Sequence, residues 1–235
     1  MIKQPFVDIH THNTESESAF IQIVNLDLEQ PCPEQGHFSY GIHPWEAEKA
    51  GFHEEKALSV LKERLAMPNV VALGEAGLDK FHGGFERQMK VFERQIVLAE
   101  NLKKPMIIHA ARSHNEIIAL RKKHRPKQPW IVHGFNGTEQ DVHQLISQGI
   151  CLSVGESLLH PDRKIHKSIS FIDLDCLFLE TDMAETGIET VYEAAAKLLG
   201  MDVSELKTII FSNFARIFRG FADNESQPIV PTGKR

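Results

Sequence analysis

Short apolar runs alternate along the chain with longer stretches in which apolar residues recur every three or four positions. The short runs are rich in β-branched residues, and several are almost continuously apolar, as is typical of parallel strands buried on both faces. The pattern predicts strands at Pro5–His12, Phe20–Leu26, His37–His43, Val70–Gly74, Pro105–His109, Trp130–His133, Ile150–Val154 and Cys176–Asp182. The stretches of helical period predict helices at Glu54–Leu65, Phe85–Asn101, Asn115–His124, Glu139–Gln148, Thr190–Leu199 and Asn213–Phe218.

A strand followed by a helix, repeated over the whole length, predicts an α/β fold with a parallel sheet and right-handed crossovers. Eight strands favour closure into a (β/α)8 TIM barrel over an open doubly wound sheet. The segment Asn13–Ser39 is the exception, because it contains no convincing helix between the first strands. No repeat, charge block or Gly/Ser linker marks a boundary, so we interpret residues 1–235 as one domain with a loosely packed tail after Phe221.

The composition is that of an ordinary globular protein of 235 residues, of which 42% are hydrophobic and 25% are charged. No apolar run is long enough to span a membrane or to form a secretory signal, and the three cysteines are widely spaced, so we expect a cytoplasmic protein. A net charge of −6 argues against a protein that coats duplex nucleic acid, but not against one that engages a single phosphate at a metal centre. The 13 histidines are a first indication of metal chemistry.

Residues able to bind metal stand at the carboxyl ends of the predicted strands. His10 and His12 are two positions apart in an extended chain, so they point to the same side. Taken alone, each such residue has a simpler interpretation as a polar strand end, a capping acid or a buried rim histidine. In a parallel barrel, however, these ends converge on one face, where four imidazoles and two carboxylates can hold two divalent ions. The six residues are His10, His12, Glu75, His109, His133 and Asp182, and Glu75 is the natural bridge between the ions.

With these motifs the sequence resembles the TatD family of metal-dependent hydrolases, within the wider amidohydrolase group of (β/α)8 barrels. No single motif is specific, but the set, in this order and spacing, covers nearly the whole chain. The matching pieces are Asp8–His12, Gly41–Trp45, Gly74–Asp79, Arg87-Gln88 with Phe92 and Gln95, Lys104–His109, His133–Gly137, Glu180–Asp182 and Asn213–Phe218.

The resemblance implies a site for two ions. His10, His12 and Asp182 would hold one ion and His109 and His133 the other, with Glu75 between them. It implies Mg²⁺, Mn²⁺ or Zn²⁺ as the metal. It also implies deoxyribonuclease activity, usually 3′→5′ on single strands, and some family members are linked to the removal of D-amino acids from tRNA.

Three features depart from the family pattern. The usual helix after the first strand is deleted or greatly shortened, which opens the rim beside His12. After Asp182 the family usually has a basic loop, whereas this chain reads Met183–Gly187. The common His-Ser-Arg is replaced by His109-Ala-Ala-Arg112, which displaces the arginine by one position. These changes leave the predicted metal ligands in place and keep a second class of substrate open.

We expect a phosphodiesterase that acts on single-stranded DNA ends, with Asp182 as general base and Glu75 bridging the ions. Candidate substrate contacts are His43, Arg112 and Asn136, although His43 has the alternative of shaping a loop and Arg112 that of pairing with a surface acid. The same activated water could attack a carbonyl, so an ester or amide hydrolase, such as an aminoacyl-tRNA deacylase or a small-molecule amidohydrolase, is the second hypothesis. A non-catalytic metal-binding protein is the third, and the intact ligand positions argue against it.

The remaining expectations concern structural roles. Arg87 and Gln88 should be structural, and Phe135 should pack in the interior rather than stack on bases. Asn213 should cap the last helix. We expect a monomer or a weak homo-oligomer without membrane association.

Overall fold

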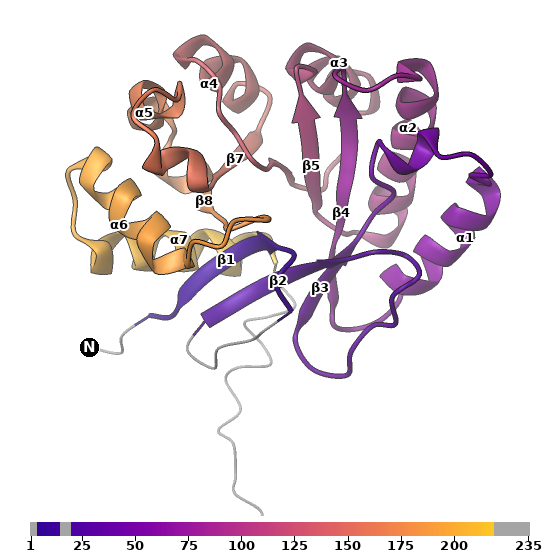
Figure 1. Cartoon of the computed structure of the whole chain (residues 1–235), viewed down its shortest axis with the longest axis horizontal. Helices are drawn as coiled ribbons and strands as arrows, with labels where there is room; N and C mark the ends of the chain where they lie inside the picture. The colour runs from indigo at the N-terminus through magenta and orange to yellow at the C-terminus, as the bar shows by residue number, and fades with distance from the viewer. Residues whose placement is uncertain (1–3, 15–19, 219–235) are drawn as a thin grey trace, which may run out of the picture.

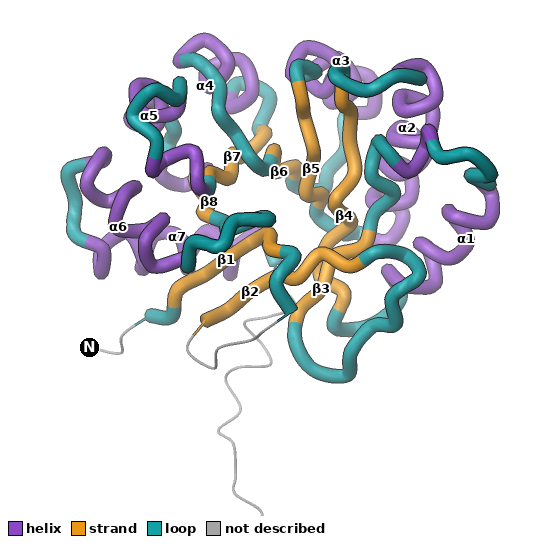
Figure 2. The backbone as a smooth tube through the Cα atoms, in the orientation of Figure 1, coloured by secondary structure: helices purple, strands orange, loops and turns teal. Residues whose placement is uncertain are grey.

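The computed structural model describes residues 4–14 and 20–218. Within them, eight parallel strands form one sheet whose order follows the sequence, and the helices cover its outer side (Figures 1 and 2). The strands are β1 (Phe6–Thr11), β2 (Phe20–Leu26), β3 (His37–Tyr40), β4 (Val70–Asp79), β5 (Met106–Ala111), β6 (Trp130–Val132), β7 (Ile150–Val154) and β8 (Leu177–Leu179). The α-helices are α1 (Glu54–Leu65), α2 (Phe85–Leu102), α3 (His114–His124), α4 (Glu139–Ile146), α5 (Ile165–Ser168), α6 (Ile188–Leu199) and α7 (Val203–Ile217). The predicted barrel is confirmed, in a nearly closed form.

The barrel closes between its first and last strands near their carboxyl ends. The amide of Asp182 donates to the carbonyl of His10 at 2.9 Å, and the amide of His12 donates to the carbonyl of Asp182 at 3.0 Å. Towards the amino ends of these strands, a side chain of α6 takes the place of a neighbouring strand and forms hydrogen bonds with the backbone of β1. The Tyr192 hydroxyl accepts from the amide of Val7 and donates to its carbonyl, both at 3.1 Å. Among the described residues, backbone pairing across the seam is therefore confined to the end where the predicted metal ligands lie.

The first connections of the barrel are short. Residues 12–19 alone separate β1 from β2, which pair directly in parallel, and the described residues 27–36 between β2 and β3 include no helix. The regular strand–helix alternation begins with α1, which precedes β4. This agrees with the absence of a helical pattern in Asn13–Ser39.

Two boundaries differ from the sequence-based prediction by about five residues or more. β4 continues to Asp79 instead of ending at Gly74, so Glu75 lies inside a strand. The last helix begins at Val203, and Asn213 therefore lies within it instead of capping it. Its side-chain amide donates to the carbonyls of Leu174 and Leu177 at 2.7 and 3.0 Å, which ties α7 to the segment entering β8. The predicted cap was wrong because these acceptors come from a distant part of the chain. The tail predicted to be loosely packed after Phe221 lies outside the described residues.

The core lies inside the barrel and between the sheet and its helices. α2 is typical, because its buried residues, which include Val91, Phe92 and Ile96, recur on one face. The ring of Phe92 lies 6.1 Å from that of Trp130 in β6. Complete burial of such a side chain contributes about 1.5–3 kcal/mol, so this face fixes the helix against the sheet. Within residues 4–14 and 20–218, no helix combines the length and apolar character that crossing a membrane requires.

Candidate metal centre

The structure brings together the six residues that the sequence marked as metal ligands. His10 is in β1 and His12 directly follows it, Glu75 is in β4 and His109 in β5, and His133 and Asp182 follow β6 and β8. Within the described residues, the groups of side chains with the geometry to hold an ion all fall here: His10, His12 and Asp182; His10, Glu75 and His133; and His43, Glu75 and His109. The convergence of parallel strand ends explains how such distant residues meet.

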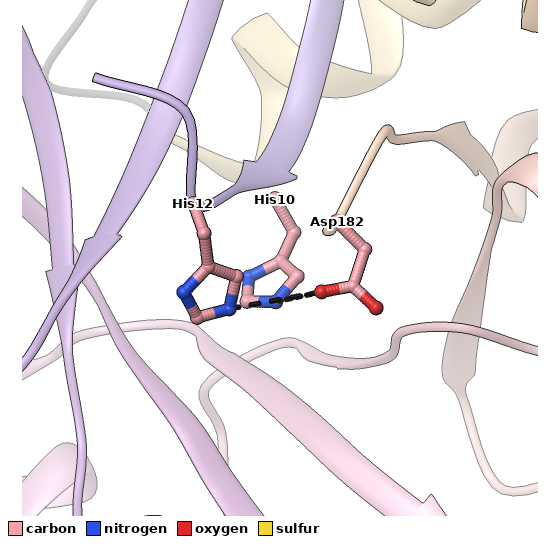
Figure 3. Close-up of side chains that lie close together, drawn as sticks. All are labelled: His10, His12 and Asp182. Atoms are coloured by element: carbon pink, nitrogen blue, oxygen red, sulfur yellow. Dashed lines mark ion pairs between the residues drawn. The ribbon is translucent and has the colours of Figure 1, made fainter. Parts of the chain in front are cut away.

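Four donor atoms form a first group beside the seam between β1 and β8, and Figure 3 draws the three side chains among them that come from His10, His12 and Asp182. The Nε2 atom of His10 lies 3.5 Å from Oε2 of Glu75 and 3.5 Å from Oδ1 of Asp182. The Nε2 atom of His12 lies 3.5 and 3.6 Å from the same two oxygens. Ligand atoms about 2.1 Å from a tetrahedral metal ion are separated by roughly 3.4 Å. The spacing of this group therefore fits one ion at its centre.

Three imidazoles form a second group around the other oxygen of Glu75. Its Oε1 atom lies 2.7 Å from Nδ1 of His109, 2.9 Å from Nε2 of His133 and 3.2 Å from Nε2 of His43. Those separations are hydrogen-bond distances, and they are shorter than the separations of 3.5 and 3.6 Å between the donor atoms of the first group. The two oxygens of one carboxylate thus face two separate sets of imidazoles.

The two carboxylates of the cluster, Glu75 and Asp182, are stabilised in their ionised form by nearby positive charge. Burial alone would raise the pKa of Glu75, but the charge of His133 and hydrogen bonds with His10, His109 and His12 hold it well below its usual value. Burial would also raise the pKa of Asp182, yet the hydrogen bond with His10 and the neighbouring imidazolium charges keep it lowered. Both carboxylates are therefore ionised at neutral pH.

These carboxylates in turn raise the pKa of His10. Burial and the charge of His133 lower the pKa of His10, but its hydrogen bonds with Asp182 and Glu75 raise it by more, to about 9. Without a metal, protons on the imidazoles supply the compensating charge. The contacts of His10 Nε2 with the two carboxylates are long, at 3.5 Å, and its buried Nδ1 has no hydrogen-bond partner among the described residues. Divalent ions satisfy such donors and replace these protons, so the residues present fit a metal centre.

The position of Asp182 leaves one of its carboxylate oxygens available for a role other than binding a metal ion. Its Oδ1 atom faces the two histidines, while its side chain is 40% exposed to the pocket and its other oxygen points away from them in Figure 3. Its backbone adopts a left-handed φ of 53°, which is uncommon for a residue with a side chain.

Two carboxylates that the sequence did not single out lie beside the ring nitrogens of His109 and His133 that face away from Glu75. Oδ2 of Asp79 lies 3.3 Å from Nε2 of His109 and accepts from the indole of Trp45 at 2.7 Å. Oε1 of Glu180 accepts from the amide of Gly134 at 2.6 Å and lies 3.4 Å from Nδ1 of His133. Carboxylates in this position orient metal-ligating imidazoles and raise their basicity. Their only sequence signal was their place in the Gly74–Asp79 and Glu180–Asp182 motifs.

Other predicted residues have scaffold contacts. The buried amide of Gln88 accepts from the Asp79 amide at 2.8 Å and donates to its carbonyl at 3.0 Å. The Arg87 guanidinium donates to the carbonyl of Phe52 at 3.1 Å, and Phe135 is 1% exposed, so it packs in the interior. Gly77 allows the close approach of β4 to β5, since a Cβ there would lie 2.0 Å from the His109 carbonyl oxygen.

The three candidate substrate contacts line one pocket of about 1050 Å³ above the cluster. His43 reaches Glu75, as described. Arg112 is exposed and its guanidinium lies 4.7 Å from the centre of the Phe81 ring. The side-chain oxygen of Asn136 accepts from the amide of Ile165 at 3.2 Å, so this residue has a structural partner. A substrate role for each remains a prediction.

Comparison with known proteins places this geometry in a family. Residues 7–219 match the family described as TatD related DNase. The chain is 34% identical over 174 residues to the uncharacterized metal-dependent hydrolase YjjV of Escherichia coli K12, an alignment that spans 72% of this chain and 64% of that protein. It is 28% identical over 232 residues to the 3′-5′ ssDNA/RNA exonuclease TatD of Edwardsiella piscicida, which covers 89% and 85% of the two chains.

Solved structures agree with the sequence comparisons. The crystal structure of the TatD homolog YjjV from Escherichia coli superimposes with a TM-score of 0.79 at 25% identity, over 91% of this chain and 98% of that one. A TatD family hydrolase from Entamoeba histolytica shares the fold, with a TM-score of 0.72 at 16% identity, over 93% of this chain and 99% of that one. The chain therefore belongs to the TatD-related DNase family of metal-dependent hydrolases.

Proposed function

We propose that this chain hydrolyses phosphodiester bonds at the ends of single-stranded DNA, using two divalent ions. The observation that carries the proposal is the position of Glu75, whose Oε2 faces His10 and His12 while its Oε1 faces His43, His109 and His133. A carboxylate between two sets of imidazoles is suited to bridging a pair of ions. The name of the Edwardsiella relative supports a single-stranded nucleic acid as substrate.

The residues divide between two ions of one pair. His10, His12 and Asp182 would hold the first, His109 and His133 the second, and Glu75 would touch both. Mg²⁺, Mn²⁺ and Zn²⁺ are the candidates. When bound, such ions lower the pKa of a coordinated water and stabilise negative charge that develops on phosphoryl oxygens.

The chain's own groups then direct the reaction. The free oxygen of Asp182 accepts the proton of the attacking water, since its other oxygen is engaged by His10 and His12. Glu180 and Asp79 keep His133 and His109 in position from behind. The depressed pKa of Asp182 keeps this base ionised at neutral pH.

An ester or amide hydrolase is the second candidate, and one observation favours it. The segment that follows Asp182 begins with Met183, which lines the pocket and is 74% exposed, instead of with a basic residue. An apolar rim there suits an uncharged acyl group. Assays of single-stranded DNA, aminoacyl-tRNA and simple lactones side by side separate the two reactions.

The test of the leading proposal combines metal content with one substitution. Protein purified without chelator should contain about two ions per chain and should cleave single-stranded DNA when Mg²⁺ or Mn²⁺ is supplied. Asp182→Asn should lower kcat by at least 100-fold, since general-base catalysis contributes about 10²–10⁴-fold. Asp162→Asn, an exposed aspartate that does not line the pocket, is the matched control. Near wild-type cleavage by folded Asp182→Asn, or less than one ion per chain with no activation by added metal, would refute the proposal.

A further inference from the structure

The rim of the pocket above the cluster is divided by charge. Arg112 follows β5, and Arg163 and Lys164 lie beyond β7, just before α5. Asp27 and Glu46 follow β2 and β3 and line the same pocket. We call Arg112, Arg163 and Lys164 the basic arc. A single pocket therefore has a cationic side and an acidic side, with the candidate metal centre on its floor.

The cations of the basic arc have no carboxylate partners within residues 4–14 and 20–218. All three side chains belong to exposed residues, and none forms an ion pair there. The acidic residue on this side of the pocket, Asp141, is already engaged, because it accepts from the amide and hydroxyl of Thr138, both at 2.7 Å, and lies 3.6 Å from His114. The three cations of the arc outnumber this one carboxylate, so this side of the pocket carries net positive charge beside the floor.

The backbone that carries Arg163 and Lys164 is fixed to the metal-binding side of the barrel. The Ile165 amide donates to Oδ1 of Asn136 at 3.2 Å, and the Ser168 hydroxyl donates to the Gly137 carbonyl at 2.8 Å. Asn136 and Gly137 belong to the segment that begins with His133. Asn136 is therefore a positioning residue for the two cations.

Arg112 adds a flat surface to the arc. Its guanidinium lies 4.7 Å from the centre of the Phe81 ring, and Phe81 is 65% exposed at the pocket. Proteins that bind single-stranded nucleic acid combine cations along the backbone with exposed aromatic rings on which bases stack. Arg112 and Phe81 supply one of each at the same point.

We infer that the basic arc binds the backbone phosphates next to the scissile bond. The inference rests on the proposed function, because the floor of the pocket must hold the scissile phosphate. Three cations on one side suit the successive phosphates of one strand. The arc also replaces the basic segment that is absent after Asp182.

The test measures how binding depends on salt. Short single-stranded DNA and RNA oligonucleotides with a fluorescent end are titrated with protein in Ca²⁺, and affinity is read from fluorescence anisotropy. Each phosphate contact to a single strand contributes a log–log salt slope of about −0.7, so three contacts weaken binding about 20-fold between about 50 and 200 mM salt. Arg163→Ala/Lys164→Ala should leave a loss of only about 3-fold over the same range. Equal losses of affinity for DNA and RNA mean that the arc contacts phosphates and not the sugars or bases, as inferred.

The matched control is Lys56→Ala/Lys197→Ala, which removes the same charge from exposed lysines outside the pocket and should keep the wild-type salt dependence. A wild-type salt dependence in Arg163→Ala/Lys164→Ala would overturn the inference, as would an equal change in the control.

Hydrolysis of bis(p-nitrophenyl) phosphate distinguishes failure of the arc from failure of the centre. The double variant of the arc should hydrolyse this small diester at the wild-type rate, while its KM for the oligonucleotide rises about tenfold, the equivalent of about 1.4 kcal/mol. A wild-type protein that leaves the small diester intact with every metal would refute the proposed function, and the salt dependence would still decide the role of the arc.

Discussion

Replacement of Gln95 tests how the barrel holds the segment that carries His43. Gln95 is completely buried in α2. Its side-chain oxygen accepts from the Ile42 amide at 2.7 Å, and its side-chain nitrogen donates to the Ile42 carbonyl at 3.0 Å. Gln95→Leu keeps a side chain of similar size but leaves both backbone groups of Ile42 without partners.

The expected loss of stability follows from these two groups. Each buried polar group without a partner costs about 1–3 kcal/mol, so the pair costs roughly 2–6 kcal/mol. Burial of leucine in place of a polar amide offsets part of this, which leaves a loss of about 3 kcal/mol in the free energy of unfolding. In a chain of this size, 1 kcal/mol lowers Tm by about 2–4 °C, so Tm should fall by about 6–12 °C.

Thermal unfolding followed by circular dichroism measures the difference. Gln140→Leu is the control, since Gln140 is exposed in α4 and its substitution should change stability by no more than about 0.5 kcal/mol. If Gln95→Leu has the same Tm as Gln140→Leu, the two hydrogen bonds to Ile42 do not stabilise the protein and the reasoning is refuted.

Three further predictions concern the seam, the start of α4 and the metal. Tyr192→Phe leaves both backbone groups of Val7 unpaired and should lower the free energy of unfolding in urea by about 2 kcal/mol; an unchanged urea midpoint would contradict this. Burial would raise the pKa of Asp141, but its hydrogen bonds with Thr138 hold it below the usual value. Its contribution is therefore present above about pH 4 and is lost as the pH falls, and Asp141→Asn should flatten this acid limb of the stability curve; an equally steep limb would rule it out. Removal of the metal by a chelator should lower Tm by about 5–11 °C relative to protein at 100-fold ion excess over Kd, and identical melting curves would exclude a metal centre.

The periodicity of the sequence predicted the barrel because each strand is an apolar run that ends in a polar group. This rule failed at β4, where Gly74 and Glu75 interrupt the apolar run. The strand nevertheless continues, since its ladder depends on backbone pairing with β5 rather than on side-chain polarity. Glu75 consequently reaches the cluster from inside a strand.

Local preference also misled the prediction for Asn213. Asparagine favours helix caps, but here two carbonyls from the segment before and within β8 accept from its side chain inside a helix. The same limit applies to Asp79 and Glu180, whose partners Trp45 and Gly134 are far away in sequence. Residue type and spacing predict which side chains meet at the strand ends, whereas the groups behind them depend on tertiary contacts.

The seam between β1 and β8 has a consequence for biosynthesis. His10 and His12 leave the ribosome before strands β2 to β8 are made, whereas Asp182 follows β8. The nascent chain therefore holds these two imidazoles without the carboxylate of Asp182 until β8 has been made. Under the proposed function, an ion held by His10, His12 and Asp182 is captured only after β8 has been made, and it would fasten the two ends of the sheet in the same event that completes the barrel.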